Sequence, residues 1–135
     1  LSTAQYAKTL GLKPRAKIVA FSHHAQESKW FTTAPIYAIQ KLLEKTGWSK
    51  DSVDAFEINE AFAVVAMVAL KDLSLSHAKL NVHGGACALG HPIGASGTRI
   101  VVTLLNVLER IQGKRGIAAI CIGGGEALAL AIERE

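Results

Sequence analysis

Hydrophobic positions follow two different periods along this chain, and the changes of period predict an alternation of strands and helices. Short apolar runs predict strands over residues 17–23, 53–58, 80–82, 117–122 and 127–132. Longer segments with helical spacing predict helices over residues 1–10, 35–46, 60–73 and 95–111, whereas residues 25–33 lose the pattern and are expected to form a loop.

Strands that alternate with helices in this way are typical of an α/β domain. After the first helix, the order βαβαβαββ predicts a mainly parallel five-stranded sheet with helices on both faces and an antiparallel last strand, which the glycines at 123–125 would turn back. The helix over 95–111 is apolar around much of its circumference, so we expect it to be covered on more than one side. Loops after parallel strands gather at one sheet edge, where Asn59 and Gly123 would lie.

Length and composition limit the possible classes of protein. A chain of 135 residues that is 50% hydrophobic predicts a single domain over residues 1–135. It starts at Leu1 without a charged segment before an apolar stretch, which gives no sign of secretion and some sign of an excised piece. The longest apolar run, residues 61–70, is about half of a membrane span, so no membrane association is expected. Two cysteines form no disulfide framework, which indicates a reducing, cytoplasmic location.

The formal net charge of +4 and the pI of about 9.2 do not by themselves indicate nucleic-acid binding. The basic residues are dispersed, and no aromatic side chains are interleaved with a basic stripe. We expect most of them to form a solvated surface. A ligand that carries a diphosphate would need only a few of these charges.

One histidine, His91, lies in a segment rich in glycine, residues 84–97, which is typical of an active-site loop. Two other interpretations stay open: a structural turn histidine, or a metal ligand with His83 and Cys87 at spacings of four residues. The metal site would require a helix, which the glycines and Pro92 disfavour, so no metal is expected. Ser96 and Thr98 are expected to cap the following helix.

Two further positions combine a structural and a chemical interpretation. Asn59 directly follows a strand and is expected to cap the helix over 60–73, with Glu60 as a favourable charge in its first turn. Cys121 ends an apolar strand, where it is either a small buried hydrophobic residue or a thiol that the three following glycines leave open to a substrate. Phe62 is expected in the core by default, and Cys87 is expected to serve only packing.

These features form three motifs that resemble the C-terminal signatures of the thiolases, that is, the acetyl-CoA acetyltransferases and the 3-ketoacyl-CoA thiolases. The motifs stand in the family's order and at about its spacing: Asn59-Glu60-Ala61-Phe62-Ala63, then Gly90-His91-Pro92-Ile93-Gly94-Ala95-Ser96-Gly97, then Cys121-Ile122-Gly123-Gly124-Gly125. Residues 7–19 look like the stretch that joins the family's two halves. The resemblance covers the C-terminal half and leaves the N-terminal half, which carries the nucleophilic cysteine, unmatched.

The resemblance implies roles for these residues. His91 would activate the nucleophilic cysteine and donate from Nε2 to the thioester oxygen as it becomes an enolate. Cys121 would be the base that takes the α-proton, and a neighbour or a dipole would have to favour its thiolate. Asn59 would orient a water beside His91, and the N–H of Gly123 would complete a second oxyanion hole. Phe62 and Ala61 would line the site for pantetheine and acyl groups.

The implied function is half of an active site for thiolytic Claisen condensation or cleavage of short or medium acyl-CoA, within fatty acid metabolism. Coenzyme A would be a substrate and no cofactor would be needed. The expected partners are the absent N-terminal domain and further copies of the chain, in a dimer or tetramer. The alternatives are a non-catalytic acyl-CoA or lipid-binding protein on the same fold, and a dinucleotide-binding oxidoreductase domain. The last lacks support because no Gly-x-Gly-x-x-Gly follows the first strand.

Overall fold

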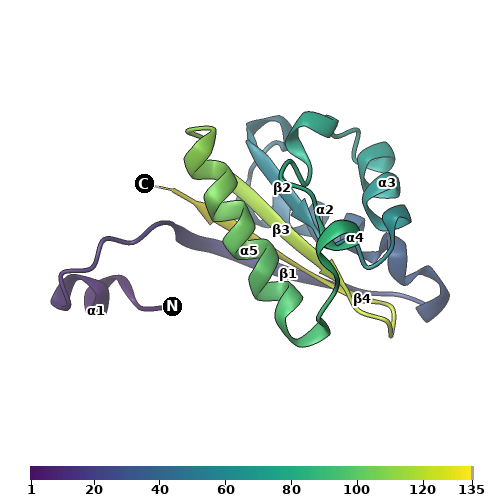
Figure 1. Cartoon of the computed structure of the whole chain (residues 1–135), viewed down its shortest axis with the longest axis horizontal. Helices are drawn as coiled ribbons and strands as arrows, with labels where there is room; N and C mark the ends of the chain where they lie inside the picture. The colour runs from purple at the N-terminus through teal and green to yellow at the C-terminus, as the bar shows by residue number, and fades with distance from the viewer. Residues whose placement is uncertain (135) are drawn as a thin grey trace.

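A mixed sheet of four strands forms the centre of the computed structural model, which describes residues 1–134 (Figure 1). Its strands are β1 (Lys17–Ala25), β2 (Ala55–Ile58), β3 (Arg115–Cys121) and β4 (Glu126–Glu133), in the order β1-β4-β3-β2. β4 pairs antiparallel with both β1 and β3, whereas β2 pairs parallel with β3. The α/β class and the antiparallel last strand are therefore confirmed.

The predicted five-stranded, mainly parallel sheet is wrong in two respects. β4 folds back from β3 and lies between β3 and β1, so only one pair of neighbouring strands is parallel. Residues 80–82 form no strand, and Leu80 makes only an isolated bridge with Phe56. The cause is Asn81, which has φ 48° and uses its side-chain amide to bond both the N–H and the C=O of Ile58. This side chain replaces the backbone ladder that a fifth strand would have made.

Helices cover both faces of the sheet, as predicted (Figure 1). The helices are α1 (Ala4–Thr9), α2 (Ala34–Thr46), α3 (Ala63–Asp72), α4 (Ala86–Leu89) and α5 (Ile93–Arg110), and short 3₁₀ helices cover Ser28–Thr33, Lys50–Ser52 and His77–Lys79. The expected loop over residues 25–33 is therefore partly helical. Within residues 1–134, no helix combines the length and the apolar character that crossing a membrane requires.

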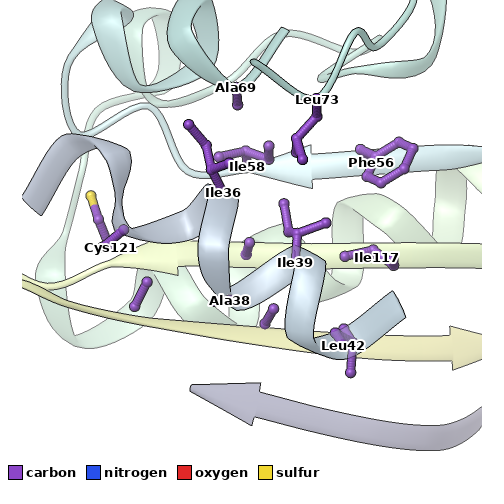
Figure 2. Close-up of a cluster of buried hydrophobic side chains, with 14 of the residues drawn as sticks. Ile36, Ala38, Ile39, Leu42, Phe56, Ile58, Ala69, Leu73, Ile117 and Cys121 are labelled. Carbon is purple, nitrogen blue, oxygen red and sulfur yellow. The ribbon is translucent and has the colours of Figure 1, made fainter. Parts of the chain in front are cut away.

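The core consists of two layers, one on each side of the sheet. α2 and α3 pack on the face that presents Phe56, Ile58, Ile117 and Cys121, as Figure 2 shows for most of these side chains. α5 packs on the opposite face through Ile100, Leu104, Val107 and Leu108. Val102, on the outer side of α5, is exposed, so the predicted cover on more than one side of this helix is not present within residues 1–134.

Two of the expected helix caps are wrong. α3 begins at Ala63 with Phe62 at its N-cap, and α5 begins at Ile93 with Pro92 at its N-cap, in both cases without a side-chain cap. Asn59 instead extends β2, because its backbone N–H donates to the carbonyl oxygen of Ala119 on β3. Ser96 lies inside the first turns of α5. Both polar side chains are thereby free to take part in the contacts described next.

Candidate active site

Asn59 and His91 meet at the end of β2, although 31 residues of chain separate them in the sequence. The side-chain nitrogen Nδ2 of Asn59 lies 3.4 Å from Nε2 of His91. Asn59 is fully buried, and the His91 ring is partly exposed. The loop that precedes α5 thus brings the imidazole against the end of a central strand, with one edge of the ring accessible.

Ser96 holds the other nitrogen of the imidazole. Its Oγ lies 2.6 Å from His91 Nδ1 and 3.1 Å from the carbonyl oxygen of Pro92. The hydroxyl can donate to Pro92 and accept from Nδ1–H, or it can turn and donate to Nδ1, and in the second case Nε2 carries the ring proton. In that tautomer Asn59 and His91 direct two donors to one place. Such a pair of donors suits an oxygen on which negative charge develops.

Glu60 anchors the glycine-rich segment to the end of β2. Its carboxylate accepts hydrogen bonds from the Asn81 side chain at 2.9 Å and from the backbone N–H of Cys87 at 3.1 Å. A Cβ atom at Gly85 would collide with this carboxylate, so a larger residue there would require the carboxylate to move away from these two hydrogen bonds. Glu60 lies outside α3, so the expected charge in its first turn is wrong, and the residue connects β2 with α4 instead.

A short helix, α4, does form in the segment where the glycines and Pro92 were expected to disfavour one. It fits between Gly85 and Gly90, and Gly90 ends it with φ 88°. Among residues 1–134, no group of three or more His, Cys, Asp or Glu side chains is arranged to hold a metal ion. The spacing of His83, Cys87 and His91 therefore does not produce a three-ligand cluster, and Cys87 is exposed.

Cys121 ends β3 at the same edge of the sheet, since Asn59 bonds to Ala119 two residues before it. Alternation along the strand places the Cys121 side chain on the α2 face, where Figure 2 shows it at the end of the buried cluster. The following glycine turn is open at Gly123, where an added Cβ would meet nothing within 4 Å. Gly125 has φ 111° and packs on the backbone of Gln26, which secures the turn.

The surroundings of Cys121 within this chain favour the thiol over the thiolate. Burial raises the pKa of the Cys121 thiol, and a backbone hydrogen bond offsets only part of that increase. The side chain is 6% exposed. Among residues 1–134, that backbone hydrogen bond is the one contact that lowers the pKa of the Cys121 thiol.

The two predicted substrate-binding residues lie beside this edge. Phe62 is 60% exposed, so its default assignment to the core is wrong. Its ring meets Phe31 edge to face, with centroids 6.1 Å apart. Ala61 is partly buried against the core. An exposed aromatic ring next to the site is suited to contact with an apolar ligand.

Glu57 and Arg99 are two site residues that the sequence analysis missed. Glu57 is 1% exposed on β2, and its Oε2 lies 3.6 Å from Nη1 of Arg99 on α5. The other guanidinium nitrogen, Nη2, donates to Oδ1 of Asn59 at 3.3 Å. A single charged residue inside each of two otherwise uncharged segments, 55–58 and 95–108, was the signal that could have identified them.

Burial raises the pKa of Glu57 to about 7; Arg99 opposes this change, and the nearby Glu60 adds to it. Because the folded-state pKa exceeds the unfolded-state value, the folded chain binds the proton more tightly, and the stability gained at low pH is lost as the pH rises through about 7. We expect the free energy of unfolding to fall by up to about 3 kcal/mol from this group between pH 5 and pH 8.

Urea unfolding of the chain at pH 5, 6, 7 and 8 would measure this dependence, with Glu57→Gln as the matched control. The difference between the two proteins isolates the contribution of Glu57 from those of the other titratable groups. An equal loss of stability in both would contradict the prediction.

The comparisons with known proteins agree on one family. Residues 12–134 match the family described as the C-terminal domain of thiolase. The cytosolic acetyl-CoA acetyltransferase of Rattus norvegicus is 52% identical over 128 residues, covering 95% of this chain and 32% of the relative. The probable acetyl-CoA acetyltransferase of Dictyostelium discoideum is 52% identical over 134 residues, covering 99% of this chain and 32% of the relative.

Solved structures give the same result. The acetyl-CoA acetyltransferase of Bacillus anthracis superposes with a TM-score of 0.95 at 44% identity, covering 98% of this chain and 34% of that chain. A thiolase of Ascaris suum in complex with coenzyme A superposes with a TM-score of 0.93 at 43% identity, covering 99% of this chain and 35% of that chain. The chain belongs to the thiolase family and corresponds to its C-terminal domain. It spans about a third of the length of these relatives.

Proposed function

We propose that this chain is the C-terminal half of an enzyme that transfers acyl groups between acyl-CoA molecules, by Claisen condensation or by thiolytic cleavage. The observation that carries the proposal is the meeting of Asn59 and His91 beside the glycine-rich loop, at the sheet edge where Cys121 also ends. The names of the relatives, acetyl-CoA acetyltransferases, support condensation of two acetyl-CoA molecules to acetoacetyl-CoA and CoA.

In this proposal His91 and Asn59 stabilise the enolate. When Ser96 donates to Nδ1, the ring proton stands on Nε2, and the Asn59 amide directs its own N–H to the same place. The thioester oxygen, or a water that it bonds, would accept from both groups as charge moves onto it. These hydrogen bonds are stronger to the enolate than to the neutral thioester, so they lower the barrier to enolate formation.

Cys121 is the proposed base for the α-proton and the acid that later returns a proton. The raised pKa of its buried thiol favours the protonated form, which suits the acid step, whereas the base step needs a thiolate. Packing of the missing half of the enzyme against this edge is the proposed source of the additional stabilisation. The N–H of Gly123, in an open turn, would form the second oxyanion hole with an amide of that other half.

Coenzyme A thioesters enter as substrates, and the proposed chemistry requires neither a metal nor a redox cofactor. The exposed Phe62 ring and Ala61 are the proposed contacts for the pantetheine and acyl groups. The proposed partners are the N-terminal half of the family and further copies of the full-length chain, in a dimer or tetramer. Cytosolic relatives in rat and mouse support a cytoplasmic location, and a role in fatty acid metabolism follows from the proposed substrates.

The chain alone is expected neither to make nor to cleave acetoacetyl-CoA, because covalent catalysis needs an acyl-accepting cysteine from the other half. The full-length protein is expected to do both. Absorbance of the magnesium complex of the 3-ketoacyl-CoA reports the reaction, with the Cys121→Ala chain as the control. Turnover by the chain above this control would contradict the prediction.

The same assay tests the alternative of a non-catalytic acyl-CoA or lipid-binding protein. If the full-length protein binds acyl-CoA in calorimetry but neither makes nor cleaves acetoacetyl-CoA, the result would favour this alternative over the proposed enzyme.

A further inference from the structure

A continuous line of side-chain contacts runs from Glu57 through Arg99 to Asn59 and ends on the candidate catalytic histidine. Glu57 and Asn59 are buried, and Arg99 is partly exposed. Glu57 and Asn59 stand two residues apart on one strand, so both side chains face α5. Arg99 reaches from α5 to both of them, through Nη1 to Glu57 and through Nη2 to Asn59. The proposed function uses Asn59 and His91 but leaves Glu57 and Arg99 without a role.

The donors along this line of contacts determine the orientation of the Asn59 side-chain amide. A guanidinium group has donors only, so it requires the Asn59 oxygen on its side. The Asn59 nitrogen then faces His91 at 3.4 Å. With the amide reversed, the Asn59 NH₂ would point at a positive guanidinium and its oxygen at His91, and the two donors of the enolate site would become one.

Glu57 in turn holds Arg99 in place. Its carboxylate is buried and has no hydrogen-bond partner among residues 1–134, and neither has Nη1 of Arg99. The ionised carboxylate attracts Nη1 of Arg99 at 3.6 Å, and movement of the guanidinium away from it would leave a buried charge uncompensated. Ser96, three residues before Arg99, lies on the same side of α5, so one helix face controls both His91 and Asn59.

We propose that Arg99, held by Glu57, is a positioning residue that fixes the orientation of the Asn59 amide and so keeps its N–H directed to the enolate site. This inference rests on the proposed function. The Arg99 side chain contacts Glu57 and Asn59, and in this inference it acts on the enolate site only through Asn59.

The test uses the full-length protein and a double-mutant cycle with Arg99→Met and Asn59→Ala. We expect Arg99→Met to lower kcat of condensation about 100-fold, which is typical of a misplaced group, and to change KM for acetyl-CoA less than about threefold. In the Asn59→Ala background the same substitution should have almost no further effect, because its target is gone. Arg110→Met, an exposed cation on the last turn of α5, is the matched control and should leave kcat unchanged.

A second variant separates positioning from simple charge compensation. Glu57→Met combined with Arg99→Met removes both charges of the pair and leaves no uncompensated charge at the buried position 57, so folding should be retained. We expect its kcat to remain as low as that of Arg99→Met, because the Asn59 oxygen has still lost its donor. Circular dichroism and the assembly state verify folding.

Three outcomes are possible. The inference is supported if Arg99→Met lowers kcat in the wild-type background but not in the Asn59→Ala background, and if the Glu57→Met and Arg99→Met pair does not restore kcat. Additive losses, or recovery of kcat in the paired variant, would overturn it while the wild-type activity leaves the proposed function standing. A wild-type full-length protein without turnover would remove the proposed function and this inference together.

Discussion

Replacing Cys121 by serine in the full-length protein is expected to permit acylation of the nucleophilic cysteine and to nearly abolish condensation. A serine hydroxyl is a far poorer base than a thiolate, and general bases contribute about 100- to 10,000-fold to rates. The structure adds that position 121 is buried at the end of β3, where a hydroxyl finds no solvent to help ionise it. The two half-reactions should therefore separate.

Mass spectrometry of the acyl-enzyme, measured beside steady-state condensation rates, would detect this separation. Cys87→Ser is the matched control, since Cys87 is an exposed thiol on α4 and its side chain has no proposed role. It should leave both steps unchanged. Equal loss of acylation and condensation in Cys121→Ser would mean that Cys121 is not the base.

His91→Asn in the full-length protein is expected to lower kcat much more than it raises KM. The proposed hydrogen bond from Nε2 strengthens as charge moves onto the thioester oxygen, so its loss affects the transition state more than the bound substrate. Loss of one oxyanion donor costs about 100- to 1000-fold, and a lost role in activating the nucleophile would add to this. The 2.6 Å contact with Ser96 also disappears, which leaves the loop less tightly held.

His83→Asn provides the control, because His83 is an exposed histidine directly before the same glycine-rich segment. A decrease of only a few-fold in folded, normally assembled His91→Asn protein would favour the structural turn histidine instead. Metal analysis of wild type and His91→Asn completes the comparison. Stoichiometric zinc that is lost with His91 would identify a metal site at His83, Cys87 and His91.

The strands and helices that could be predicted were those whose conformation follows from their own side chains and end residues. α2 follows its apolar spacing, with Pro35 in its first turn and Gly47 in the left-handed conformation after its last residue. β3 follows a continuous apolar run that is buried on both faces. The strand expected at 80–82 failed because Asn81 bonds β2 through its side chain, a contact across 23 residues of sequence that no local pattern contains.

The polar residues of the candidate site also depend on contacts that the local sequence pattern does not contain. Asn59 and Ser96 have excellent capping chemistry, so local rules assign both to helix starts. In the folded chain each has a partner from elsewhere in the sequence or across a turn: Asn59 bonds Arg99, and Ser96 bonds His91. In both cases a hydrogen bond to a specific side chain takes the place of the helix cap. These partners are brought near by the fold of the chain and not by the local sequence pattern.

The sequence by itself therefore determined the class of fold and the family, because strands and helices follow from the local hydrophobic pattern and three short motifs stand in the family's order. The tertiary structure alone decided that β4 lies between β1 and β3, that Asn59 turns toward His91, and that Glu57 and Arg99 stand behind them. Strand order and side-chain orientation depend on contacts between segments far apart in the chain. Their energies are absent from any local pattern of hydrophobic and polar residues, so they appear only when the chain is folded.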